Sequence, residues 1–460
     1  MSPSLTFGIL LVLSAVGYWM GRTRAVSVAS GRRSALHSLP SYHGYFVAIW
    51  AGVPALLLFV FWLLIGQTVI DTLVMNSLPA AFSEGLTSSE LSLALASIKN
   101  TAAGVGFVSD DPVIVEAASY MNTLSATADW IAVTIVLVLA LIGLALAHRR
   151  IMVGFYARNR VERIVRIAMI VCSAIAILTT FGIVLSLFFE SLRFFERYSP
   201  LDFIFGLDWS PQTAIREDQV GSSGAFGAIP VFSGTLLIAT IAMLVAGPIG
   251  LLSAIYLSEY APRRVRGTVK PILEILAGIP TVVYGFFAVL TVAPFFRDLG
   301  LSIGIDIAAN SAISAGLVMG VMIIPFVSSL SDDVMNAVPQ ALRDGSSGLG
   351  ATKSETIRQV ILPAALPGIV GAFLLAVSRA IGETMIVVMA AGLAANLTAN
   401  PFEAVTTVTV QIVANLTGDT AFDSAKTLSA FALGLMLFVI TLFLNVFALR
   451  IVKRYREKYD

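Results

Sequence analysis

Two charged residues, Arg379 and Glu383, lie four positions apart in an otherwise apolar stretch. Residues at this spacing share one face of an α-helix, and an arginine facing lipid is costly. We therefore expect this face to look into a helix bundle or a watery cavity. The pair could neutralise itself, or Arg379 could meet a passing oxyanion whose oxygens fit the guanidinium fork. Thr384, Asn310 and Ser311 are further polar candidates for the cavity wall, or else form interhelical hydrogen bonds.

The sequence argues against catalysis by this chain. The stretch "GLGATKS" resembles part of a phosphate-binding loop, but Thr352 precedes its lysine where that motif requires glycine. No His-Glu-x-x-His motif occurs, and the single cysteine, Cys172, has no partner for a disulfide or a zinc site. We therefore predict no metal and no cofactor. The net charge of +1 gives no basic field directed at nucleic acid.

The composition is that of an integral membrane protein. Hydrophobic residues make up 57% of the chain and charged residues only 12%, whereas soluble domains have about 25% charged residues. A helix needs about 20 apolar residues to cross the hydrocarbon core. We predict an all-α polytopic fold with about nine spans, at residues 4–20, 45–70, 129–147, 166–189, 231–257, 271–295, 304–330, 367–393 and 428–452.

Basic residues in alternate loops predict the orientation. Arginine and lysine gather in the loops 21–44, 148–165 and 258–270 and in the C-terminal tail. Short loops rich in these residues face the cytoplasm. We therefore expect the N-terminus outside and the C-terminus in the cytoplasm.

The first 160 residues differ from the rest of the chain. Residues 1–160 form a predicted extension with three spans and an acidic extracytoplasmic insert at 71–128, whose Ser- and Ala-rich sequence suggests short helices. Residues 161–460 contain the six remaining spans. The extension offers no motif that carries chemistry.

A charged stretch at 331–366 separates the seventh and eighth predicted spans. Its first part predicts a short helix that stops at Gly345, followed by a turn at Gly348 and Gly350. Thr352 and Glu355 match a capping box that would start a second short helix, and Pro363 would end it. The stretch could be a plain connector, or a cytoplasmic docking element.

Proline and glycine fall inside two predicted spans. Pro248, with its neighbouring glycines, would interrupt the fifth span, and Pro280 would interrupt the sixth. Interrupted spans can line a cavity and permit bending between states. Close packing of helices through small residues is the alternative.

The charged stretch resembles the EAA loop of ABC importer permeases, whose pattern is Glu-Ala-Ala, three residues, Gly, nine residues and Ile-x-Leu-Pro. The matching positions are Asp344, Gly345, Ser346, Gly350, Val360, Leu362 and Pro363. The spacing, the glycine and Leu-Pro agree, whereas Glu-Ala-Ala itself is absent. The resemblance implies a type I permease core whose loop docks on an ATPase subunit.

Further stretches over residues 163–455 resemble the PstC family of phosphate importer permeases. They are "FGLDWSP", "FGAIPVFSGTLLIATIAMLVAGPIGLLSAIYLSEYAP", "LAGIPTVVYGFFAV" and "SRAIGETMIVV". The resemblance implies phosphate transport across the bacterial inner membrane by a non-enzymatic subunit. It also implies a PstA-like permease partner, two PstB-like ATPases and a PstS-like binding protein, with Arg379 and Glu383 as the functional pair.

Three alternatives remain open from the sequence. The substrate could be another oxyanion, such as molybdate, sulfate or phosphonate. The chain could instead be a membrane scaffold or sensor that holds a partner through its loop, in which case the loss of Arg379 would be tolerated. A self-sufficient channel would leave the capped loop without a purpose.

Overall fold

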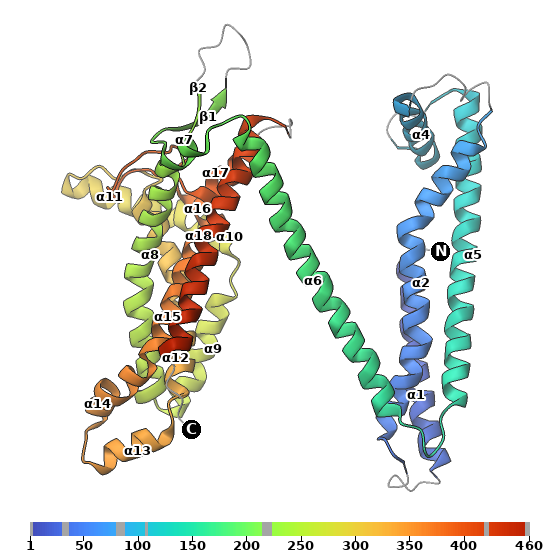
Figure 1. Ribbon diagram of the computed structural model, residues 1–460, viewed down its shortest axis with the longest axis horizontal. Helices are drawn as coiled ribbons and strands as arrows, with labels where there is room; N and C mark the ends of the chain where they lie inside the picture. The colour runs from blue at the N-terminus through green and yellow to red at the C-terminus, as the bar shows by residue number, and fades with distance from the viewer. Residues whose placement is uncertain are drawn as a thin grey trace. The chain divides into compact units, whose positions relative to one another are not determined.

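The computed structural model of the 460-residue chain describes residues 3–29, 36–79, 88–105, 109–213, 223–417 and 423–455. It divides into two compact units, Met1–Ile177 and Leu178–Asp460 (Figure 1). Within the described ranges, nine helices are long and apolar enough to span a membrane, which confirms the predicted all-α polytopic fold. They are Pro3–Val28, Pro40–Asn76, Pro112–Arg149, Ala157–Phe195, Ile229–Tyr260, Thr281–Ile303, Ala312–Asn336, Lys353–Ile381 and Ala425–Arg454.

The N-terminal unit is built on α1 (Pro3–Val28), α2 (Pro40–Asn76) and α5 (Pro112–Arg149). Glycines let α1 and α2 approach closely, because a Cβ on Gly44 would lie 2.7 Å from the Tyr18 ring. Helices in a bilayer associate through such small-residue contacts, since burial from lipid supplies no hydrophobic driving force. Helix α6 (Ala157–Phe195) begins in this unit and ends in the other.

Among the described residues of the insert at 71–128, α4 (Ser88–Ala103) is a separate helix between the extended ends of α2 and α5. The Lys99 ammonium lies 2.6 Å from the Asp71 carboxylate of α2. The Asn122 amide of α5 donates to the carbonyl of Ala102 at 3.0 Å. Both long-range bonds fasten α4 to its neighbours, and the expectation of a short helix in this insert is confirmed.

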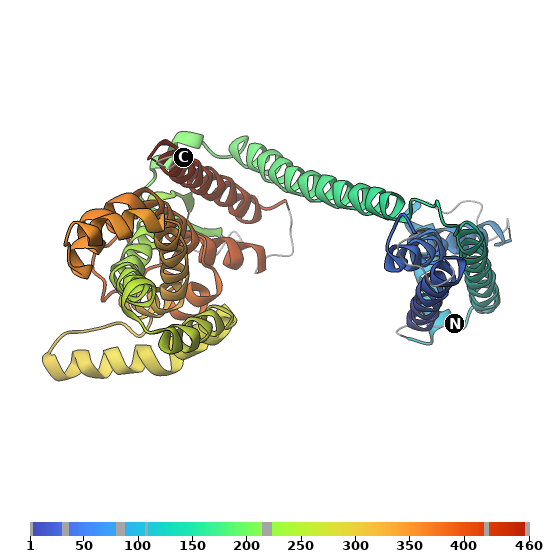
Figure 2. The same cartoon turned by 90° about the horizontal axis from the view of Figure 1, so that it is seen from below.

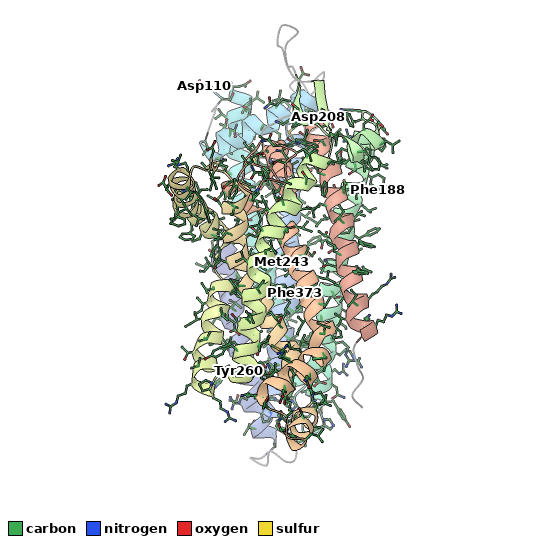
Figure 3. The ribbon with its side chains drawn as sticks, turned by 90° about the vertical axis from the view of Figure 1, so that its left-hand side faces the viewer. Asp110, Phe188, Asp208, Met243, Tyr260 and Phe373 are labelled. Atoms are coloured by element: carbon green, nitrogen blue, oxygen red, sulfur yellow. The ribbon has the colours of Figure 1, made fainter. Side chains whose placement is uncertain are left out.

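The C-terminal unit is a helix bundle with two different ends. One end carries α7 (Pro200–Phe205), the strands β1 (Trp209–Thr213) and β2 (Ser223–Phe226), and α17 (Val408–Thr417) (Figure 1). The other end carries α13 (Gln340–Gly348) and α14 (Lys353–Thr356). Figure 3 labels Asp208 at the first end, Tyr260 at the second, and Met243 and Phe373 between them. The remaining helices of the bundle are α8 (Ile229–Ile255), α9 (Arg263–Ala277), α10 (Thr281–Phe287), α12 (Ala312–Asn336), α15 (Leu362–Ile381), α16 (Met385–Ala390) and α18 (Ala425–Tyr455).

An aromatic cluster fixes the end that bears the antiparallel strands. Phe194, Phe203 and Phe226 pack together in the interior, with the first two ring centroids 5.4 Å apart. The buried indole of Trp209 donates to the side-chain oxygen of Gln411 in α17 at 2.9 Å. This two-stranded sheet was not predicted, because its strands are short and lie outside the apolar spans. Seen along the bundle, α11 (Ala293–Ile303) projects from the side (Figure 2).

Helices α8 and α12 form the centre of the bundle through small residues. A Cβ on Gly316 of α12 would lie 2.7 Å from Ile241 of α8, and one on Gly320 would lie 2.9 Å from the Ala242 carbonyl oxygen. Side chains at these positions would force the two backbones apart. The pair therefore acts as a rigid wall against which the other helices pack.

Replacing Gly320 with alanine is expected to destabilise the protein by about 1–3 kcal/mol, the usual cost of overpacking a tight core. Gly267 in the exposed part of α9 is the matched control, because a Cβ there meets nothing within 4 Å. Alanine at 267 should be neutral or stabilising by up to about 1 kcal/mol, since glycine is a poor helix former. Thermal unfolding of the two variants in detergent measures the difference, and equal midpoints would contradict close packing at Gly320.

The prolines behave differently from one another. Pro248 lies inside α8, which continues from Ile229 to Ile255, so the predicted interruption of the fifth span is wrong. A membrane helix tolerates an internal proline because neighbouring helices, polar side chains or ordered water can satisfy the freed backbone carbonyl. Pro280 is the N-cap of α10 and separates it from α9, which ends at Ala277. The sixth span is Thr281–Ile303 instead of 271–295, so Pro280 lies just before this span and does not interrupt it.

Candidate functional site

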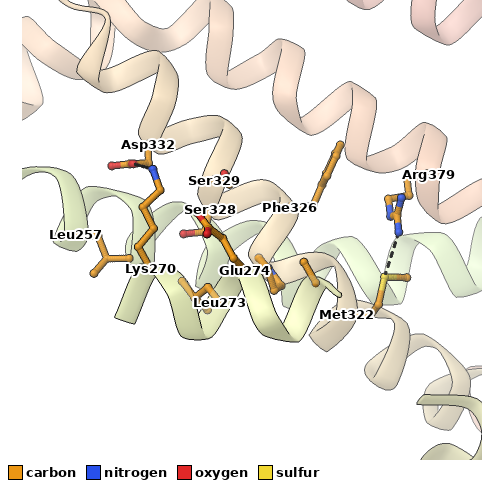
Figure 4. Close-up of a pocket in the computed structure, with 12 residues that line it drawn as sticks. Leu257, Lys270, Leu273, Glu274, Met322, Phe326, Ser328, Ser329, Asp332 and Arg379 are labelled. Carbon is orange, nitrogen blue, oxygen red and sulfur yellow. Dashed lines mark hydrogen bonds and ion pairs between the residues drawn. The ribbon is translucent and has the colours of Figure 1, made fainter. Parts of the chain in front are cut away.

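A cavity of about 310 Å³ lies in the C-terminal unit among α9, α12 and α15. Figure 4 shows Arg379 at one end of it, and Lys270 with Asp332 at the other. The lining residues are Leu257, Lys270, Leu273, Glu274, Ala277, Met322, Pro325, Phe326, Ser328, Ser329, Asp332 and Arg379. Between these two ends lie Glu274, Ser328 and Ser329 together with apolar side chains such as Leu273 and Phe326.

Arg379 extends from the last turn of α15 toward α12. Its guanidinium lies 3.9 Å from the Met322 sulfur and 5.7 Å from the centre of the Phe326 ring. Among the ion pairs of the described residues, none joins Arg379 to a carboxylate. The soft sulfur and the ring face hold the cation in place without neutralising it. The positive charge therefore remains available to an anion in the cavity.

Glu383 does not share a helix face with Arg379, and that prediction is wrong. Helix α15 ends at Ile381 with Gly382 as its C-cap, so Glu383 lies in the turn before α16. Its carbonyl oxygen accepts a hydrogen bond of 2.8 Å from the Thr409 hydroxyl. Thr384 is the N-cap residue of α16, and its hydroxyl donates to the Gly382 carbonyl at 3.3 Å. Both residues lie beyond the lining of the cavity.

The other polar candidates also lie outside the cavity. Ser311 is buried at the N-cap of α12, and its hydroxyl lies 2.9 Å from that of Ser314 in the same helix. Asn310 is exposed. The proposed interhelical hydrogen bond is therefore replaced at Ser311 by a bond within α12.

The second charged end of the cavity centres on Asp332, whose side chain is only 4% exposed. Arg266 donates to both carboxylate oxygens at 3.1 Å, Lys270 to one at 2.8 Å and Asn336 to the other at 2.9 Å. The hydrogen bond to Asp332 raises the pKa of Lys270 above its ordinary value, so this lysine stays cationic. The neighbouring Asp333 is exposed and lies 3.7 Å from Lys270.

Sequence reasoning missed this cluster. The basic residues of α9 were used only to predict orientation, and Asp332 was assigned to the connecting loop. Arg266 and Asp332 are 66 positions apart, a separation at which sequence spacing carries no signal. A buried acid just before the end of an apolar span is the one available hint, since such a group needs a cationic partner.

The predicted capping box is present in the charged stretch. The Thr352 backbone N–H donates to the Glu355 carboxylate at 2.8 Å, and the Glu355 N–H donates to the Thr352 hydroxyl at 3.4 Å. The turn before it contains Gly350 at φ +85°, a conformation that favours glycine. Asp344, Gly345 and Ser346 all lie inside α13, so Gly345 does not end that helix.

Pro363 does not end the second helix of the stretch either. After α14 the chain continues through the π-helical segment η4 (Ile357–Ile361) directly into α15, where Leu362 and Pro363 occupy the first turn. The π-helical turn before Pro363 accommodates the ring, which supplies no backbone N–H to the helix. Ile357 and Ile361 are buried in an apolar cluster with Met335, and Val360 is half-buried.

Substitution of Thr352 by alanine should loosen α14 by about 0.5–2 kcal/mol, the usual value of an N-cap side chain. Hydrogen–deuterium exchange of the α14 amides is expected to accelerate accordingly. Ser354→Ala on the same exposed turn is the control. Equal exchange in the two variants would mean that the cap contributes nothing.

Helix α13 is fastened to the end of α8 by a buried ion pair. The Arg343 guanidinium lies 2.5 and 2.6 Å from the two oxygens of Glu259, in the π-helical segment η2 (Tyr256–Tyr260), and also donates to the Met335 carbonyl at 2.8 Å. Side-chain exposure is 16% for Arg343 and 7% for Glu259. Lys353 lies 5.3 Å from the Tyr260 ring centre. The tip between the two short helices presents Leu349, which is 92% exposed.

Two family models match the chain. Residues 246–457 match the binding-protein-dependent transport system inner membrane component, and residues 8–179 match the phosphate ATP-binding cassette transporter. The probable ABC transporter permease protein YqgH of Bacillus subtilis is 33% identical over 307 residues, covering 65% of this chain and 94% of that one.

Two further relatives carry a substrate in their names. The phosphate transport system permease protein PstC of Mesorhizobium japonicum is 33% identical over 275 residues, covering 56% of this chain and 80% of that one. The protein of the same name from Haemophilus influenzae is 36% identical over 234 residues, covering 47% and 72%. These relatives are named as permeases, as expected for a transport subunit without enzymatic activity.

Proposed function

Because the chain belongs to the PstC family of ABC transporter permeases, we propose that it forms the phosphate pathway of an ATP-driven importer together with a PstA-like permease. The observation that carries this proposal is the Arg379 guanidinium, which lines the cavity and, among the described residues, contacts Met322 and Phe326 without a carboxylate partner. A cation on a membrane-spanning helix is costly unless it faces water or pairs with an anion, and the exposed Arg379 is open to both. Phosphate oxygens match its planar donors.

The partners follow from the two ends of the bundle. Two PstB-like ATPases hydrolyse ATP and grip the loop 331–366 of each permease, with Leu349 at its exposed tip. A PstS-like protein delivers phosphate at the end that bears β1 and β2. In this arrangement the C-terminus lies in the cytoplasm and the N-terminus outside, in keeping with the basic loops.

The coupling loop moves the pathway when the ATPases close. Asp344, Gly345 and Ser346 in α13 and the capped α14 form the docking element, and Arg343 transmits its movement to α8 through Glu259. Residues 161–460 supply this permease domain, and residues 1–160 form an extension that precedes it in the chain. Glu383 and Thr384 line the next section of the pathway, at the turn between α15 and α16, and Pro280 provides a hinge at the start of α10.

Uptake of radiolabelled phosphate tests the proposal. The complete complex is expressed in cells that lack other phosphate importers, and uptake is measured at micromolar phosphate with excess sulfate, molybdate or phosphonate as competitors. We expect uptake that depends on the complex and that none of the competitors suppresses. Uptake of a competitor in place of phosphate would reassign the substrate within the oxyanions.

A further inference from the structure

The Asp332 carboxylate occupies a site whose donors would also suit a transported anion. Three side chains donate to it: Arg266 through one guanidinium nitrogen to both oxygens, Lys270 at 2.8 Å and Asn336 at 2.9 Å. A carboxylate and a phosphate present similar pairs of oxygens to such donors. Lys270 and Asp332 both line the cavity that contains Arg379.

The position of this site indicates the order in which an anion would meet the cations of the cavity. Arg379 lies at one end of the cavity, whereas Arg266 and Lys270 belong to α9 and lie within the basic stretch 258–270, with Lys270 at the other end (Figure 4). Their side chains are 33% and 32% exposed, so they contact water as well as Asp332. An anion that leaves Arg379 through this cavity passes Glu274 and then reaches these two cations.

We propose that Asp332 is a built-in competitor of the transported anion, and that phosphate leaves the cavity by displacing it from Lys270 at a second anion site. This inference rests on the proposed function. Arg266 contacts both oxygens of Asp332 and keeps α9 attached to α12, while Lys270 releases the Asp332 carboxylate and binds phosphate. Competition by Asp332 keeps the second site weak, so phosphate passes through it without being retained.

Asp332→Asn removes the competing charge and preserves the shape of the side chain. Binding of radiolabelled phosphate to the whole complex in nanodiscs, without nucleotide, is expected to tighten at least about fivefold, the lower range of coupling between two sites. Asp298→Asn is the control, because it removes the same charge from an exposed position of α11, where the carboxylate lies 3.6 Å from Arg297 and not at the Asp332 site. Its phosphate affinity should equal that of the wild type.

Two further variants protect the test from a folding defect. Lys270→Gln in the Asp332→Asn background should abolish the gain, because the exchanging cation is missing. If the Asp332→Asn complex does not assemble, Lys270→Gln alone is expected to lower phosphate affinity, and an unchanged affinity overturns the inference.

The outcomes separate this inference from the proposed function. A wild-type complex that imports phosphate, combined with an Asp332→Asn complex that binds it no more tightly, overturns the competitor role alone. A wild-type complex that neither imports nor binds phosphate overturns both. Tightening in the Asp298→Asn control equal to that of Asp332→Asn would show a general charge effect, which also defeats the inference.

Discussion

Replacement of Arg379 by alanine lowers the initial rate of phosphate uptake about 10- to 100-fold. A charge-assisted hydrogen bond is worth about 1.5–3 kcal/mol, and each 1.4 kcal/mol corresponds to a factor of ten. The loss is large because no carboxylate of the described ranges pairs with the guanidinium, and an anion in the cavity would therefore depend on it. Uptake is measured in cells at matched membrane abundance of the complex.

Two control variants make the Arg379 result specific. Arg297→Ala removes an exposed arginine of α11, 3.6 Å from Asp298, and should leave uptake unchanged. Arg379→Lys keeps the charge but loses the planar fork, so an intermediate rate is expected. Wild-type uptake by Arg379→Ala would make this residue structural and would favour a pathway elsewhere in the bundle.

Replacement of Arg343 by alanine should separate ATP hydrolysis from transport. Removing one partner of a buried ion pair leaves the other charge uncompensated, at a cost of about 3–5 kcal/mol. Here the charge left without a partner is the Glu259 carboxylate, whose side chain is 7% exposed at the end of α8. Helix α13 loses its fastening to the transport bundle, so we expect ATPase activity to persist while phosphate uptake falls about tenfold or more, the scale of 1.4 kcal/mol or above.

The measurement for Arg343 compares ATPase activity and phosphate uptake in the same proteoliposomes. Arg297→Ala, at the exposed arginine of α11 outside the docking loop, is the control and should leave both activities coupled. A double variant, Arg343→Gln with Glu259→Gln, removes both charges and is expected to recover part of the uptake. If Arg343→Ala transports normally, the link between α13 and α8 has no part in coupling.

Local features were predictable because their determinants are close together in the chain. The apolar runs set the spans, and the capping box depends on Thr352 and Glu355, only three positions apart. The predictions that assumed regular geometry were wrong. Pro248 did not interrupt α8, and Gly382 ended α15 before Glu383 could join the face of Arg379.

The sequence by itself determined that this protein is a polytopic membrane protein with a capped loop between two of its spans, because hydropathy and capping are local properties. Only the tertiary structure decided which charges meet. Asp332 pairs with Lys270 and Arg266, which lie 62 and 66 positions away in the sequence, and Arg343 pairs with Glu259, which lies 84 positions away. These pairings depend on how closely α8 and α12 pack at Gly316 and Gly320 and on the π-helical segments that rotate the following residues. Such contacts arise from the packing of whole helices, which no short pattern in the sequence encodes.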